Sequence, residues 1–395
     1  MQNHTRATVP AEPPAEGSTL NPAPKAPLIA RLTRPLSMLV LALATGLAPA
    51  QTGSTLPRST VETISVNPGQ RTQIQQFVDN WAPRVTSDDA QGTKRGIEAL
   101  TEPLQSRGVS VAFRQAYTQA LNPLLTQLED SGSIADKLSI LRIAADLATP
   151  SAAARVRDLM DDEDRGVRLF AISRAGQVFE TTSVHGPAMT GNDANALIDS
   201  IAQAADHDTH PEMLRACARA LGSGSNISSR DLAQARSRAI IALSDLVGQR
   251  LQALEPGDDP SFAQSLALDA AASTTRSLSD ITAEVNADAA RAAVRLGGDI
   301  ISVALRRVLG STIEPVADRE LTVRSVQAGE TLLYFARRKA AELRGESLNS
   351  VEETRFSTML KNGEDRDFRN QAAKLLGPGS PIVTAFDFES DRFLR

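Results

Sequence analysis

Two stretches near the middle of the chain decide its fold. They read Arg157-Asp-Leu-Met-Asp-Asp-Glu-Asp-Arg-Gly-Val-Arg-Leu-Phe-Ala-Ile-Ser-Arg-Ala-Gly176 and Ile201-Ala-Gln-Ala-Ala-Asp-His-Asp-Thr-His-Pro-Glu-Met-Leu-Arg-Ala-Cys-Ala-Arg-Ala-Leu-Gly222. In both, an apolar helical pattern ends at an Asp-x-Asp corner, and a second helical pattern opens with an aliphatic residue followed by arginine. The two stretches therefore look like two copies of one helix pair.

The corner residues of the two copies have clear physical roles in such a unit. Arg168 and Arg215 lie 47 residues apart, a period typical of two-helix solenoid units. Asp164 and Asp208 are expected to accept hydrogen bonds from the free N–H groups of the helix that follows each of them. The two arginines are expected to bridge to the acidic corner of an adjacent repeat, which would fix the stacking angle.

This pattern resembles the HEAT repeat family, whose corner between helices reads Asp-x-Asp and then Val-Arg before an alanine-rich second helix. The resemblance covers about residues 133–222. It implies an all-α fold, in which antiparallel helix pairs stack as a right-handed superhelix, an α-solenoid of HEAT or armadillo type. It also implies a structural role for the corner residues. These are Asp162, Asp164, Arg168, Asp206, Asp208 and Arg215.

Helical periodicity continues on both sides of the two copies. Ile74, Phe77, Val78 and Trp81 form one helix face, which Pro83 is expected to end. Short connections between the later helices favour antiparallel neighbours. The further expected helices cover roughly 88–103, 109–129, 133–148, 151–161, 165–180, 192–206, 211–222, 229–254, 260–309 in two pieces, 316–343, 347–361 and 365–376.

The helical-repeat domain is thus expected to span residues 69–376. Before it, residues 51–68 read as a linker with at most a short extended piece at Val61 to Val66. After it, the tail at 377–395 is rich in large apolar residues and is expected to dock as a strap over the last helices. These tail residues are Ile382, Val383, Phe386, Phe388 and Phe393.

Composition excludes several classes of protein. With 14 aromatic residues in 395, the chain is poor in strand formers, which argues against an all-β fold. The lone cysteine, Cys217, cannot form an intramolecular disulfide and is expected to be a small buried residue. The net charge of −5 argues against binding to nucleic acid, which needs a surplus of basic residues.

The first 50 residues predict export. Leu36 to Leu47 form an apolar run of 12, followed by Ala48-Pro-Ala50, whose small residues suit a signal peptidase. A membrane span needs about 20 apolar residues, so no stable span is expected after cleavage. We expect a disordered leader and signal peptide at 1–50, cleaved near Ala50 and Gln51. The mature chain would be periplasmic or extracellular.

Few residues suggest chemistry. Asp206, His207 and His210 concentrate metal-ligand types, but the spacing is not the His-Glu-x-x-His pattern, and the cluster occupies a repeat corner. Arg337-Arg338-Lys339 is a possible basic patch for an acidic partner. The same charges would also complement the carboxyl end of a helix. No catalytic residue and no cofactor is indicated.

Two functions therefore stay open. The first is a non-catalytic exported helical-repeat protein, a binding or scaffold module for another protein or an envelope polymer. The alternative is a metal-assisted hydrolase centred on Asp206, His207 and His210, which would need further ligands from distant parts of the chain. A third ligand close to both histidines would favour the hydrolase, whereas side chains that point into solvent would argue against it.

Overall fold

The computed structural model describes residues 55–255, 257–310, 316–347 and 353–394. Every regular element in these ranges is a helix, as the sequence predicts, and no β-strand occurs among them. The expected leader and signal peptide at 1–50 lie outside the described residues, as does the start of the expected linker.

Most helices lie close to their predicted positions, but the start of the helix expected at 347–361 was wrong, because that helix begins only at Phe356 and the described residues 353–355 are not helical. The helices are α1 (Arg58–Val61), α2 (Pro68–Val85), α3 (Ala90–Thr101), α4 (Val111–Ser131), α5 (Ile134–Leu147), α6 (Pro150–Asp158), α7 (Arg165–His185), α8 (Gly191–His207), α9 (Pro211–Ser225), α10 (Ala233–Gln252), α11 (Ser261–Ser279), α12 (Ala287–Leu309), α13 (Val316–Arg344), α14 (Phe356–Asn362), α15 (Asp365–Leu376) and α16 (Pro381–Ala385). Three 3-10 turns accompany them, η1 (Glu102–Gln105), η2 (Leu159–Asp161) and η3 (Arg230–Leu232).

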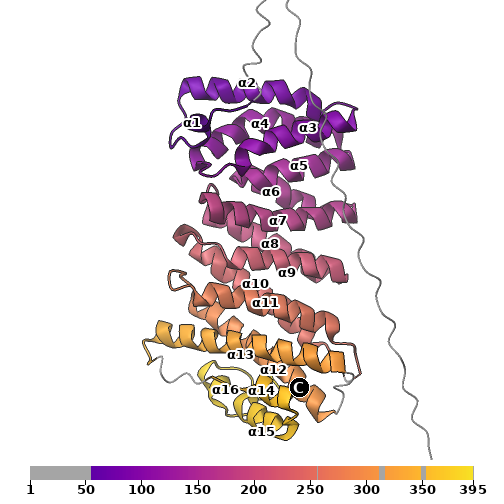
Figure 1. Ribbon diagram of the computed structural model, residues 1–395, viewed down its shortest axis with the longest axis vertical. Coiled ribbons are helices and arrows are strands. Elements are labelled where there is room, and N and C mark those ends of the chain that lie inside the picture. Colours follow the sequence, from indigo (N-terminus) through magenta and orange to yellow (C-terminus); the bar gives the residue numbers. More distant parts are fainter. Residues whose placement is uncertain (1–54, 256, 311–315, 348–352, 395) are drawn as a thin grey trace, which may run out of the picture. The chain divides into compact units, whose positions relative to one another are not determined.

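The helices stack in two layers, in a solenoid-like arrangement (Figure 1). In the odd layer, α3, α5, α7, α9, α11 and α13 each pack against the next. In the even layer, α6, α8, α10 and α12 do the same, with α2 and α4 before them. Each helix packs an apolar face against the helices of the other layer. Stacking therefore buries a continuous core between the two layers.

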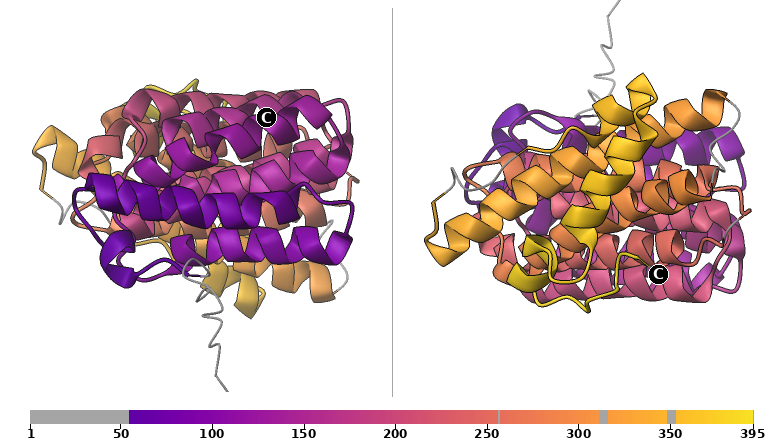
Figure 2. Two further views of the ribbon diagram at one scale, coloured as in Figure 1. Left: turned by 90° about the horizontal axis from the view of Figure 1, so that it is seen from above. Right: turned by 90° about the horizontal axis from the view of Figure 1, so that it is seen from below.

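The C-terminal end of the stack departs from this alternation. Seen from below, the last helices lie obliquely across the preceding ones (Figure 2). There α15 packs on α12, and α14 packs on α13. The sequence pattern of 365–376 predicts a helix but contains no corner motif that would set its angle.

Another expectation about a helix boundary was wrong. Pro83 does not end the first long helix, because α2 continues to Val85, and α4 likewise contains Pro123. Both prolines are exposed, so water can reach the carbonyl that each proline leaves without a partner. Within the expected linker the structure adds the short helix α1, whose Thr60 and Val61 are buried.

Arginines join neighbouring helices at their carboxyl ends. Of the 42 basic residues 36 are arginine, and several donate to carbonyls that a helix leaves without an internal partner. Buried Arg114 on α4 donates to the carbonyl of Leu147 at 3.3 Å, and also to the carbonyls of His185 and Gly186. A guanidinium has five N–H donors, so it can serve several carbonyls where an ammonium would serve fewer.

The same contact recurs along the even layer. Arg250 on α10 donates to the carbonyl of Ala205 on α8, and Arg306 on α12 donates to that of Leu251 on α10 at 3.0 Å. Each such arginine therefore fixes the carboxyl end of the preceding helix in its layer.

The described part of the tail, residues 377–394, packs on the end of the stack, as the sequence predicts. Phe393 is 1% exposed and lies so close to Gly298 on α12 that a Cβ atom there would be 2.5 Å from the phenyl ring. The hydroxyl of Ser302 donates to the carbonyl of Phe393, and Arg291 donates to that of Asp387 at 2.7 Å. Contacts along its length hold the tail to α12.

Candidate functional site

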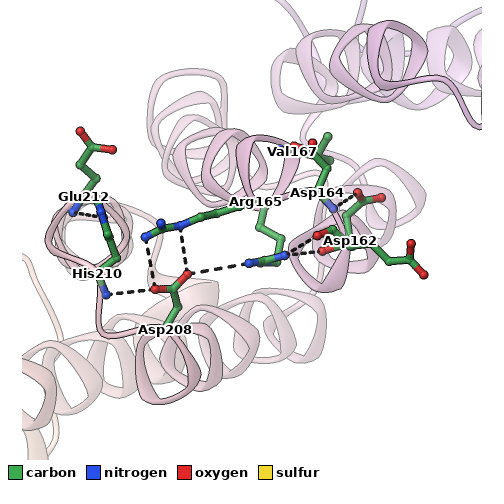
Figure 3. Close-up of polar contacts among 9 residues, drawn as sticks. Asp162, Asp164, Arg165, Val167, Asp208, His210 and Glu212 are labelled. Carbon is green, nitrogen blue, oxygen red and sulfur yellow. Dashed lines mark hydrogen bonds and ion pairs between the residues drawn. The ribbon is translucent and has the colours of Figure 1, made fainter.

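The first corner, between α6 and α7, is built by two aspartates (Figure 3). Asp164 caps α7, because its Oδ1 accepts a hydrogen bond from the N–H of Val167 at 3.0 Å. Asp162 in turn accepts from the N–H of Asp164 at 2.9 Å. The Asp-x-Asp corner therefore satisfies the amino end of the second helix, as its sequence predicts.

The second corner, between α8 and α9, differs from the first. Asp208 accepts from the N–H of His210 at 3.0 Å, but it does not cap α9. That role belongs to His210, whose Nδ1 accepts from the N–H of Glu212 at 3.3 Å (Figure 3). The expectation that Asp208 would cap α9 was wrong, because Thr209 and His210 lengthen this corner and move the aspartate away from the helix.

Ion pairs connect the two corners. Arg165 and Arg168 on α7 approach Asp208 at 3.4 and 3.8 Å, and Arg168 also donates to the carbonyl of Asp162 at 2.8 Å. From the other side, Lys137 on α5 lies 2.6 Å from Asp162. These five residues form a corner network that joins α5, α7 and the corners that precede α7 and α9.

The corner network also shifts the pKa of the Asp162 carboxyl group. Burial by itself would raise the pKa of Asp162, but hydrogen bonds from Lys137 and from the N–H of Asp164 outweigh it, and the pKa is lowered. The charged form is therefore the one that the folded protein favours.

Arg215 behaves differently from Arg168. Its guanidinium lies over the ring of Phe262 on α11, 5.1 Å from the ring centroid, rather than beside an acidic corner. The contact still joins α9 to the next helix of the odd layer, but through a cation–π interaction. The remaining corner residue, Asp206, is exposed at the end of α8.

A groove lies beside the corner network, between α7 and α9 on the odd layer. It has a volume of about 720 Å³ and a mixed lining of apolar, polar and charged side chains. Gly176 allows the two helices to approach, since a Cβ atom there would meet the Cα of Ala220 at 3.3 Å. The groove is lined by Gly166, Leu169, Phe170, Ser173, Gly176, Gln177, Glu180, Glu212, Arg215, Ala216, Arg219, Ala220 and Ser223.

Contacts between arginine and phenylalanine side chains join helices of the odd layer on both sides of the groove. Arg174 lies 4.5 Å from the ring centroid of Phe170, and Arg142 on α5 lies 6.0 Å from the same centroid. With Arg215 over Phe262, these contacts extend across α5, α7, α9 and α11. Sequence reasoning missed these contacts. Their signal in the sequence was the presence of Phe170 and Phe262, two of the scarce aromatic residues, within expected helices.

The candidate metal ligands do not converge. Asp206, His207 and His210 are exposed, and Nδ1 of His210 is already an acceptor for a backbone N–H. Within the ranges that the structure describes, no three His, Cys, Asp or Glu side chains are placed to hold one ion. Cys217 is buried, as expected, and burial raises the pKa of its thiol to about 12.

The candidate basic patch is partly used within the protein. Lys339 has a side chain that is 8% exposed and lies 3.2 Å from Glu342. Arg338 donates to the hydroxyl of Tyr334 at 2.9 Å and lies over its ring. Arg337 is half-buried. The three residues therefore do not form a single exposed cationic surface.

Comparison with known proteins identifies no relative: no protein-family model matches the sequence, and no curated protein matches it. In the described part of the chain, no helix has the length and apolarity needed to cross a membrane. The groove and the corner network beside it are therefore the features of this structure that bear on function.

Proposed function

We propose that this chain is a non-catalytic helical-repeat protein of HEAT type that binds another protein through the groove between α7 and α9. The groove is the single observation that carries the proposal. Its exposed arginines, Arg215 and Arg219, and its half-buried Phe170 belong to residue types that are enriched at protein interfaces. Glu180 and Glu212 at its border would set the orientation of the partner.

The corner network supports this proposal because it gives the groove rigid walls. Arg165 and Arg168 tie α7 to the corner that precedes α9, so the two helices that form the groove keep their spacing. A preformed site loses little conformational entropy when a partner binds.

We further propose that the protein acts outside the cytoplasm, as a scaffold in the cell envelope or as a secreted module. The apolar run from Leu36 to Leu47 and the small residues before Gln51 support this part of the proposal. The hydrolase alternative lacks support in the described residues, because no third ligand accompanies His207 and His210 there.

A crosslinking experiment tests the binding function. The chain from residue 51 to 395 is used to recover crosslinked partners from envelope and soluble fractions of its source. The groove variant carries Arg215→Glu and Arg219→Glu. Arg71→Glu with Arg95→Glu makes the same charge change on exposed positions of α2 and α3 and serves as the control.

The proposal predicts one partner that the wild type and the control recover equally and that the groove variant loses by roughly tenfold or more. Thermal unfolding of all three proteins shows that they are folded. Equal recovery by the groove variant would contradict the assignment of the interface to this groove.

A further inference from the structure

A small polar cavity lies between α10, α12 and the tail. Its volume is about 180 Å³, more than ten times the minimum of roughly 10–15 Å³ that one water needs. Every residue in its lining is polar or charged. They are Gln252 from α10, Asp299, Ser302 and Arg306 from α12, and Arg392 from the tail. We call this space the terminal cavity.

Most polar atoms around the terminal cavity have partners in the protein. Asp299, which is 2% exposed, accepts from Arg392 at 3.1 Å and from the side-chain amide of Gln252 at 3.2 Å. Ser302 donates to the carbonyl of Phe393, and Arg306 donates to that of Leu251. Two buried atoms remain without a protein partner, Nε of Arg306 and Nε of Arg392.

Both unpartnered atoms are N–H donors on permanently charged groups. A ligand that satisfies them must therefore offer acceptors. Arg306 and Arg392 together outweigh the single carboxylate of Asp299, so the lining has one excess positive charge. Two guanidiniums disfavour a metal cation, and the polar lining disfavours an apolar ligand.

From this geometry we propose that the terminal cavity is a binding site for a small oxyanion, a carboxylate or a phosphate. Arginine forks suit the oxygen atoms of both groups. Because Arg392 belongs to the tail, the ligand would touch α12 and the tail together and would stabilise the docked tail. This site is separate from the groove between α7 and α9. The proposal of an oxyanion site is therefore independent of the proposed function.

Titration of the purified chain with inorganic phosphate and with acetate tests the proposal. Calorimetry and thermal unfolding are measured with sodium chloride adjusted to constant ionic strength. The first variant, Arg392→Gln, removes one donor from the terminal cavity. The control, Arg291→Gln, removes a different contact to the tail, the one to the carbonyl of Asp387. Arg291 does not line the terminal cavity.

The proposal predicts saturable binding of phosphate or acetate to the wild type and the control, and the anion that binds identifies the ligand class. Arg392→Gln should weaken that binding by about tenfold or more, since one charge-assisted donor is lost. Absence of saturable binding of both anions to the wild type would overturn the proposal and leave a cavity filled by water. Equal binding by Arg392→Gln and the wild type would also overturn it, because the anion would then be bound elsewhere.

Discussion

Replacing Asp299 by asparagine should change how the stability of the protein depends on pH. The carboxyl group is 2% exposed on α12, and burial raises its pKa from the ordinary value of 3.8 to about 6. Arg392, Gln252 and Arg295 oppose the increase without cancelling it. Compared with the unfolded chain, the folded protein therefore favours the neutral carboxyl group up to a higher pH, and the group ionises near pH 6 even with an arginine beside it.

The magnitude follows from the difference between the two pKa values. It corresponds to about 3 kcal/mol, since one pKa unit is about 1.36 kcal/mol. Because the folded pKa is the higher one, this contribution to stability is fully present below about pH 4 and is lost as the pH rises through 6. Asparagine is neutral at every pH, so the Asp299→Asn protein does not lose this contribution to stability as the pH rises.

Urea denaturation between pH 4 and pH 8 measures the effect. The free energy of unfolding of Asp299→Asn, minus that of the wild type, should increase by up to about 3 kcal/mol over this range. Taking the difference removes the contribution of all other titrating groups. Asp269→Asn, on an exposed position of α11, is the control for the loss of a carboxyl group elsewhere. If the difference for Asp299→Asn changed with pH no more than that of the control, the raised pKa would be contradicted, because the buried carboxylate would then carry no penalty.

Three further substitutions test how the stack is held together. Gly298→Ala places a methyl group against the ring of Phe393 and should destabilise the docked tail by about 1–3 kcal/mol, which faster proteolysis of the tail would reveal; an unchanged rate would contradict the packing. Arg114→Met leaves three carbonyls at the ends of α5 and α7 without their donor and should lower the free energy of unfolding by about 3 kcal/mol in urea; a loss below 1 kcal/mol would mean that water replaces the guanidinium. Asp164→Ala removes the cap of α7 and should lower it by roughly 1 kcal/mol, whereas Asp206→Ala, at an exposed position, should change it by less than about 0.5 kcal/mol; equal effects would argue against the cap.

Local patterns predicted most of the fold. The apolar spacing of each helix depends on neighbours three and four residues away, so the sequence places α3 to α13 nearly where the structure has them. The cap at Asp164 depends on a residue three positions later and was also predictable. The docking of the tail followed from its apolar residues alone, because such residues gain free energy by leaving water.

Contacts between distant residues were the part that local patterns could not supply. Arg114 meets carbonyls 33 and more than 70 residues later, and nothing in the sequence near it indicates a buried arginine. The two residues that lengthen the second corner moved the cap from Asp208 to His210, a change that the similarity of the two copies concealed. The groove depends on the distance between α7 and α9, which no single helix determines.

The obliquely packed C-terminal helices and the docked tail have a consequence for how the protein associates with itself. A row of similar helix pairs has no natural last member, because the surface that receives one pair is repeated on the next. Head-to-tail contacts of this kind build open filaments when nothing closes them. By covering α12 with Phe393 and its neighbours, the docked tail gives this side of the described stack a surface of a different shape. We therefore expect the docked tail to oppose head-to-tail association at this surface.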